Sequence, residues 1–197
     1  MKRILDKAVV CVIGLGYVGF PLAEAFSRRL KVIGFDVNSK RIADLRRSNT
    51  NPNFILTDKA EEIAGADFFI ICVPTPVTEF KEPDLSYVIG AAQTAGRHIK
   101  KGAVVVLEST VYPGVTEDIV GPVIEKESGL KCGRDFKLGY SPERINPGDD
   151  EHSIDKVTKV VAGMDEETSG LLTELYGKVA PKVFLARNIK TAEAAKV

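Results

Sequence analysis

Three glycines near the start of the chain, Gly14, Gly16 and Gly19, have the spacing of a phosphate-binding turn. They follow an apolar run at residues 8–13 and begin a helical pattern at residues 17–29. In such a turn the first glycine permits a tight bend, the second lets the backbone approach a pyrophosphate, and the third lets the helix pack closely on the strand. The helix amino terminus offers N–H groups and a partial positive charge to the phosphates. The spacing therefore predicts a dinucleotide site.

An acidic residue, Asp36, ends the second apolar run, at residues 32–35. A carboxylate in this position can accept hydrogen bonds from both ribose hydroxyls, whereas a 2′-phosphate would meet like charge. The pattern thus favours NAD over NADP as the cofactor. Arg41 lies nearby in the sequence and can contact the adenosine. The alternative interpretation is a turn of the same type that binds FAD or only packs a helix against a strand.

Two further loops with unusual sequences follow predicted strands. Two prolines stiffen residues 73–77, where Thr75 offers a hydroxyl, and residues 108–114 contain the hydroxyls of Ser109 and Thr110. Ligands of open α/β sheets bind beyond the carboxyl ends of the strands, so these loops are candidate parts of a site. The simpler interpretation is that these residues only form turns and cap a helix.

A third loop, at residues 140–148, contains Glu143 and Arg144. Glu143 would place a carboxylate at a strand end, and Arg144 could bind a phosphate or a carboxylate. From spacing alone, a surface ion pair explains these two residues equally well.

The elements that must position these loops alternate between strand and helix along most of the chain. Strands are predicted at residues 8–13, 32–35, 68–73, 104–107, 137–140, 157–162 and 182–185. Helices are predicted at residues 17–29, from 38 or 39 through 45, and at 85–99, 116–127, 166–176 and from 191 to 197. Such alternation predicts an α/β fold with a doubly wound parallel sheet of the Rossmann type. The two stretches with the least pattern are residues 49–57 and 146–153.

The composition excludes several classes of protein. Hydrophobic residues make up 44% of the chain, and 27 basic side chains balance 27 acidic ones. There is no basic stripe that would indicate a nucleic-acid partner. The longest apolar runs are strand-sized, well short of the ~20 residues that cross a bilayer. Residues 1–7 have no signal-peptide pattern, so we expect a cytoplasmic protein without a membrane partner.

The cysteines and histidines do not indicate a metal site or a disulfide framework. The three cysteines, Cys11, Cys72 and Cys132, are odd in number and widely spaced, and the two histidines, His98 and His152, are far apart in the sequence. Cys11 and Cys72 lie inside apolar runs, as small buried hydrophobic residues do. We therefore expect no bound metal.

Taken together, four motifs in this order resemble the UDP-glucose/GDP-mannose dehydrogenase family. They are the glycine fingerprint that ends in Tyr17-Val18-Gly19, then Val-Pro-Thr-Pro, Ser-Thr-Val-Tyr-Pro-Gly and Ser-Pro-Glu-Arg-Ile-Asn-Pro-Gly. The last motif, preceded by tyrosine, is most similar to the UDP-N-acetylhexosamine branch, such as the UDP-N-acetylglucosamine 6-dehydrogenases of Vi-type capsule synthesis. The resemblance covers the whole chain.

The resemblance implies an NAD-dependent oxidation of the 6-hydroxyl of a UDP-sugar to a carboxylate, in two hydride transfers, for polysaccharide biosynthesis. In that family a cysteine traps the intermediate aldehyde, and water hydrolyses the thioester that the second oxidation forms. By motif, Thr110 matches a hydroxyl that helps hold the catalytic water, Glu143 a general base, and Lys196 a lysine that stabilises oxyanions. The positions that the turn and the resemblance together assign to the cofactor are Gly14, Gly16, Tyr17, Val18, Gly19, Asp36, Arg41, Thr75 and Thr110.

Two departures from the family pattern limit what this chain is expected to do. Pro147 stands where UDP-glucose-type members often have a second acid, which argues against UDP-glucose as the substrate. The sequence also lacks the Gly-Gly-x-Cys segment of the family nucleophile. We expect a truncated chain, with an NAD-binding domain at residues 1–190 and the start of a central connecting helix at 191–197. Alone it should be inactive.

The complete enzyme is expected to be a homodimer or a larger homo-oligomer, and its sugar specificity to depend largely on the carboxyl-terminal domain. The rival class is the 6-phosphogluconate/β-hydroxyacid dehydrogenases, which share the architecture and an early glycine turn. The Ser-Pro-Glu-Arg loop argues against that class.

Overall fold

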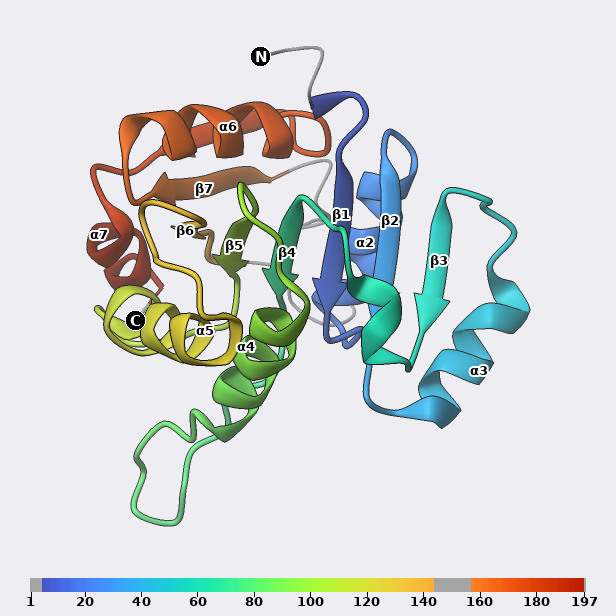
Figure 1. Cartoon of the computed structure of the whole chain (residues 1–197), viewed down its shortest axis with the longest axis horizontal. Helices are drawn as coiled ribbons and strands as arrows, with labels where there is room; N and C mark the ends of the chain where they lie inside the picture. Colours follow the sequence, from blue (N-terminus) through green and yellow to red (C-terminus); the bar gives the residue numbers. More distant parts are fainter. Residues whose placement is uncertain (1–4, 144–156, 197) are drawn as a thin grey trace.

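An eight-stranded sheet forms the centre of the protein. The computed structural model describes residues 5–143 and 157–196 (Figure 1). Along the sheet the strand order is β3-β2-β1-β4-β5-β6-β7-β8. The strands are β1 (Val9–Ile13), β2 (Lys31–Phe35), β3 (Phe54–Thr57), β4 (Phe68–Ile71), β5 (Val104–Leu107), β6 (Lys137–Tyr140), β7 (Thr158–Gly163) and β8 (Lys182–Leu185). The order reverses between β1 and β4, which is where doubly wound sheets bind dinucleotides.

The pairing confirms the predicted fold class with one correction. Every strand pair is parallel except β6 and β7, which are antiparallel. The sequence has no helical pattern between these two strands, and an antiparallel neighbour does not need a crossover helix. The sheet is therefore mostly parallel rather than wholly parallel.

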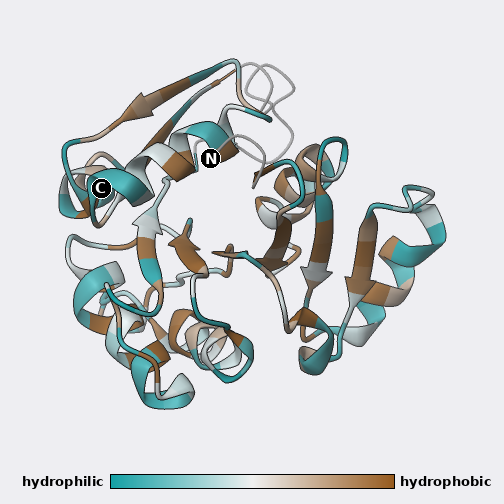
Figure 2. Cartoon of the chain, turned by 45° about the horizontal axis from the view of Figure 1, so that its top comes forward, coloured by the Kyte–Doolittle hydropathy of each residue, from teal (hydrophilic) through white to brown (hydrophobic). Residues whose placement is uncertain are grey.

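Helices cover both faces of the sheet. They are α2 (Gly19–Ser27), α3 (Ser39–Ser48), the 3₁₀ helix η1 (Ala60–Ile63), α4 (Ser86–His98), the π-helix η2 (Val115–Val120), α5 (Gly121–Ser128), α6 (Glu166–Tyr176) and α7 (Ile189–Ala194). Leu22 and Phe26 of α2 share one apolar cluster with Leu172 of α6, whereas Ala92 of α4 and Ile124 of α5 belong to the other. Figure 2 shows the central strands as largely hydrophobic, with hydrophilic residues on the outer helices.

Several elements differ from their predicted extents. Strand β3 lies within residues 49–57, one of the two stretches with the least pattern, where no strand was predicted. The predicted helix 116–127 begins as the π-helix η2 and continues as α5. Helix α7 begins before residue 191 because the Asn188 side chain accepts a hydrogen bond from the backbone N–H of Thr191. Of the two predicted caps for α3, Asn38 is the one that the structure uses.

Part of the predicted third loop lies outside the described residues, which include neither Arg144 and Pro147 nor His152. Within the described part of the chain, no helix is long and apolar enough to span a bilayer. The same residues contain no group of three or more histidines, cysteines or carboxylates that could hold a metal ion.

Candidate functional site

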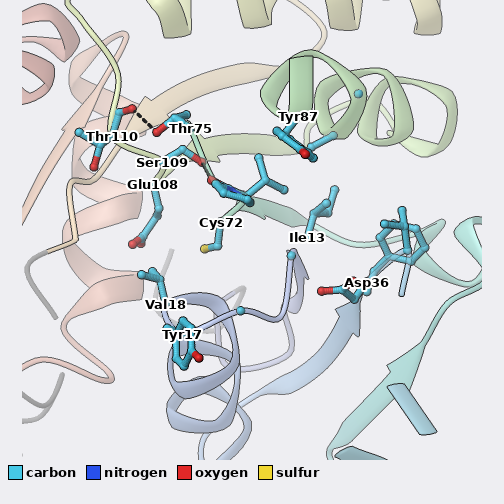
Figure 3. A pocket seen from close by; sticks show the side chains of 18 of the residues that line it. Ile13, Tyr17, Val18, Asp36, Cys72, Thr75, Tyr87, Glu108, Ser109 and Thr110 are labelled. Carbon is cyan, nitrogen blue, oxygen red and sulfur yellow. Dashed lines mark hydrogen bonds between the residues drawn. The ribbon is translucent and has the colours of Figure 1, made fainter. Parts of the chain in front are cut away.

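A cavity of about 900 Å³ opens at the carboxyl ends of the central strands. Its lining includes the glycine turn after β1, Asp36 after β2, Thr75 after β4, Glu108 after β5, and the pair Glu143 and Lys196. Figure 3 shows Asp36 and Glu108 on opposite sides of the cavity, with Cys72 between them. The fold thus brings residues from all the predicted loops to one space.

The glycine turn has the geometry that its spacing predicts. Gly14 adopts φ = 92°, a left-handed conformation that residues with a side chain rarely adopt, and its N–H donates to the Phe35 carbonyl oxygen at 2.8 Å. A Cβ atom on Gly19 would lie 1.8 Å from the Gly14 carbonyl oxygen. Only glycine therefore lets helix α2 approach β1 this closely.

The start of α2 has the features of an anion site. Val18, at the amino-terminal cap, makes no side-chain cap bond. The first turn of a helix leaves backbone N–H groups for an external acceptor. A Cβ atom on Gly16 would meet no atom within 4 Å, so the space beside this backbone is open toward the cavity. These features fit a dinucleotide pyrophosphate.

Asp36 and Arg41 support the glycine turn as well as facing the cavity. The Asp36 carboxylate accepts from the N–H of Leu15 at 2.8 Å and from the N–H of Asn38 at 2.9 Å. Nη1 of Arg41 donates to the Leu15 carbonyl oxygen at 2.9 Å. The two charged side chains thus hold Leu15 from both of its backbone polar groups, which was not predicted from the sequence.

Two hydroxyl groups join the loop at residues 73–77 to the loop at residues 108–114. Oγ1 of Thr75 donates to the Thr110 carbonyl oxygen at 2.7 Å (Figure 3). Oγ of Ser109 donates to the Val73 carbonyl oxygen at 2.6 Å. The predicted hydroxyl residues therefore lie side by side although the loops are far apart in the sequence.

Glu143 is only 4% exposed, and it lines the cavity on the side of Glu108, to which Lys159 links it. The Oε2 atom of Glu143 accepts from Nζ of Lys159 at 2.6 Å. The alternative of a surface ion pair for this carboxylate is therefore wrong, since its partner is a core lysine. Nζ of Lys196 donates to the backbone carbonyl oxygen of Glu143, which brings together two of the three residues predicted to be catalytic.

Three residues beside Glu143 were missed by the sequence analysis as functional candidates: Glu108, Lys159 and Tyr176. Nζ of Lys159 donates to Oε2 of Glu108 at 2.7 Å, and the Tyr176 hydroxyl donates to Oε1 of Glu108 at 2.5 Å. Burial raises the pKa of the Glu108 carboxyl, although Lys159 opposes that shift. Burial alone would lower the pKa of Lys159, but the two carboxylates outweigh it and the pKa is raised. Lys159 therefore carries its charge inside the core.

A further buried carboxylate, Glu193, connects α7 to the start of η2 and to Gly114 just before it. Its oxygens accept from the N–H of Gly114 at 2.6 Å, from the N–H of Thr116 at 2.9 Å and from the Thr116 hydroxyl at 2.7 Å. Lys196 follows on the same segment, so this link fixes the region from which Lys196 reaches Glu143.

Cys72 lines the cavity but is not activated as a nucleophile. The residue is buried at the end of β4. Burial, followed by the nearby Glu108 carboxylate, raises the pKa of its thiol well above the usual range. Since the thiolate is the reactive form, this agrees with the expectation that Cys72 is a buried bystander.

Comparison with known proteins places these features in one family. Residues 8–52 and 49–180 match the UDP-glucose/GDP-mannose dehydrogenase family, NAD binding domain. A UDP-N-acetyl-D-glucosamine 6-dehydrogenase of Pseudomonas aeruginosa is 43% identical over 201 residues, which cover 95% of this chain and 48% of that protein. The enzyme of the same name from Salmonella typhi is 41% identical and covers 98% of this chain and 48% of its own length.

Solved structures agree with the sequence comparison. The crystal structure of NDP-N-acetyl-D-galactosaminuronic acid dehydrogenase from Methanosarcina mazei superimposes with a TM-score of 0.89 at 31% identity, covering 99% of this chain and 47% of that one. This chain therefore spans about half the length of the relatives that it matches.

Proposed function

Because this chain belongs to the UDP-glucose/GDP-mannose dehydrogenase family as an NAD-binding domain, we propose that it is the cofactor-binding part of a longer enzyme. That enzyme oxidises the 6-hydroxyl of a UDP-N-acetylhexosamine to a carboxylate. In this proposal residues 1–190 form the NAD-binding domain, residues 191–197 begin a connecting helix, and the complete enzyme is a homo-oligomer. The rival 6-phosphogluconate-type class is not adopted, since the family match covers most of the chain.

The observation that carries the proposal is the cavity with two chemically different ends. At one end, the glycine turn and Asp36 offer backbone N–H groups and a carboxylate to a dinucleotide. At the other end, Thr110, Glu143 and Lys196 line the same cavity. When bound, NAD⁺ supplies the electron acceptor, and a substrate carbon next to it would face these three residues.

Each of the three residues has a role that its chemistry can perform. The Glu143 carboxylate can accept a proton from the water that releases the product acid. The Lys196 ammonium can stabilise negative charge that develops on a substrate oxygen. The Thr110 hydroxyl can hold the attacking water by a hydrogen bond.

The direct test of the proposed function is a turnover assay with the complete enzyme. NADH absorbance should rise when the enzyme and NAD⁺ are mixed with UDP-N-acetylglucosamine, UDP-N-acetylgalactosamine or UDP-N-acetylmannosamine. The 197-residue chain alone should bind NAD but give no turnover, because its cysteines lack the context of the family nucleophile. Robust turnover by the short chain, or none by the complete enzyme with any of the three sugars, would contradict the proposal.

Cofactor choice provides a second test, which needs only this chain. We expect tighter binding of NAD than of NADP, since a 2′-phosphate would lie against the Asp36 carboxylate. Asp36→Asn should reduce the ratio of the two dissociation constants by about tenfold, equivalent to about 1.4 kcal/mol. Isothermal titration calorimetry with both cofactors measures this ratio.

Asparagine is the informative substitution at this position, because its side chain removes the charge but keeps an oxygen that can accept from Leu15. Asp44→Asn is the matched control, since Asp44 lies on the same segment in an exposed pair with Arg47. The control should leave the ratio unchanged. Equal or tighter binding of NADP by the unmodified chain would disprove the assignment.

A further inference from the structure

Lys159 is a buried charge on the second strand from one edge of the sheet. It belongs to β7 and is 1% exposed. Its ammonium lies between the carboxylates of Glu108 and Glu143, at 2.7 and 2.6 Å, and 5.5 Å from the centre of the Tyr176 ring. The Tyr176 hydroxyl in turn donates to Glu108. Three elements that are distant in the sequence therefore meet at this one ammonium.

Stability is a poor explanation for this cluster. Replacing a buried ion pair with apolar side chains of similar size is often neutral or stabilising, because taking charges out of water costs more than their attraction returns. One ammonium between two carboxylates also leaves a net charge of −1 when all three are ionised. The cluster reaches the cavity through both carboxylates, since Glu108 and Glu143 line it. The cluster is therefore part of the cavity wall as well as of the core.

We propose that Lys159 is a positioning residue that holds the Glu143 carboxylate at the cavity wall in its ionised form, with Glu108 as the anchor of the ammonium. This proposal rests on the proposed function, in which Glu143 accepts a proton. A base must be ionised before it can act, and an opposite charge in direct contact favours the ionised form. The ammonium also fixes one carboxylate oxygen, which restricts the direction of the other.

Among the residues that the structure describes, charged and titratable groups approach Glu143 from several elements. Lys159 faces it from β7, and Glu108 lies across the ammonium at the end of β5. Cys72 at the end of β4 lies close enough for its thiol pKa to be raised by Glu143. Lys196, beyond α7, binds the Glu143 backbone. The Lys159 ammonium is in direct contact with the Glu143 carboxylate, at 2.6 Å.

The test compares two sets of substitutions in the complete enzyme, with UDP-N-acetylglucosamine and NAD⁺ as the substrates. K159M/E108Q removes one positive and one negative charge, so the cluster keeps its net charge and approximate volume. It should lower kcat at least tenfold, with smaller changes in KM. The acidic limb of the kcat–pH profile should move up by about 1 pH unit, because Glu143 loses its opposite charge.

Glu108→Gln alone should have the opposite effect on the pH profile. The ammonium is then no longer shared, and a neighbouring negative charge is lost. The acidic limb of the kcat–pH profile should therefore move to lower pH. Lys137→Met is the matched control. Lys137, on the neighbouring strand β6, makes a similar 2.6 Å ion pair with Asp165, the N-cap residue of α6, but does not line the cavity. This control substitution should not move the acidic limb of the kcat–pH profile.

A double-mutant cycle separates positioning from general damage to the fold. If Lys159 acts through Glu143, K159M/E108Q should cause no further loss of kcat in an enzyme that already carries Glu143→Gln. A structural defect would lower kcat by the same factor in both backgrounds, and that result would overturn the proposal.

The remaining outcomes are also decisive. Normal turnover and an unmoved limb in K159M/E108Q would disprove the role of Lys159 while leaving Glu143 as the base. Near-normal turnover of Glu143→Gln itself would instead disprove the proposed role of Glu143. If K159M/E108Q fails to fold or to bind NAD, the kcat–pH profile of Glu108→Gln is the deciding measurement. An acidic limb that does not move in that variant would overturn the proposal.

Discussion

Glu143→Gln in the complete enzyme is expected to lower steady-state turnover by about 10²–10⁴-fold, the usual contribution of a general base. The amide keeps the shape of the side chain and an oxygen that can accept from Lys159, so folding and NAD affinity should be nearly unchanged. Proton transfer from water is lost, because an amide does not accept a proton at neutral pH. In the proposed reaction this blocks the last step, the hydrolysis of an enzyme-bound thioester.

The blocked step has a direct signature. After mixing with UDP-sugar and NAD⁺, intact mass spectrometry of Glu143→Gln should show a covalent adduct that the unmodified enzyme does not accumulate. Slow turnover without an adduct would assign Glu143 to the earlier oxidation steps. Near-normal turnover without an adduct would exclude it from catalysis.

Glu193→Ala is expected to destabilise this chain by about 3 kcal/mol or more. Three donors, the N–H groups of Gly114 and Thr116 and the hydroxyl of Thr116, lose the carboxylate that accepts from them in a buried region. Hydrogen bonds to charged groups contribute about 1.5–3 kcal/mol each, and unsatisfied buried donors carry a similar penalty. Urea unfolding should show a lower midpoint with an unchanged m-value, which indicates a loss of stability in the native state.

An exposed glutamate provides the control for that measurement. Glu24 on α2 lies 4.0 Å from Arg28 with more than half of its side-chain surface in water. Glu24→Ala should cost at most about 1 kcal/mol, as for other surface pairs. Equal effects of the two substitutions would show that the Glu193 contacts contribute little to folding.

The nucleotide end of the cavity could be predicted from the sequence because its signals are local. Gly14 and Gly19 belong to one turn, and their roles follow from the strand before it and the helix after it. Asp36 is recognisable as the residue that ends β2. The interactions of Asp36 with Leu15 span 21 residues and became visible only in the structure.

The opposite end could not be predicted in the same way, because its contacts join distant parts of the chain. Lys159 binds Glu143, 16 residues away, and Glu108, 51 residues away, while Glu193 binds residues 77 and 79 positions away. A lysine in a strand usually points to solvent. The useful signal would have been its place in the mostly apolar run at residues 157–162, most of which is buried in the strand.

Two features of the sheet were hidden for different reasons. Strand β3 is only four residues long and follows Asn51, Pro52 and Asn53, whose residue types are typical of turns. The residue patterns of β6 and β7 do not indicate whether the two strands run parallel or antiparallel. Alternation of strands and helices therefore established the fold class but not every pairing.

The buried thiol of Cys72 has a consequence for chemical selectivity. In the proposed reaction a reactive aldehyde forms in the same cavity, and a competing thiolate there would capture it in an unproductive dead end. Burial and the Glu108 and Glu143 carboxylates keep the Cys72 sulfur protonated, so it presents the substrate with an inert surface. The carboxylates that are proposed to take part in the reaction therefore also prevent Cys72, in the cavity wall, from competing as a nucleophile.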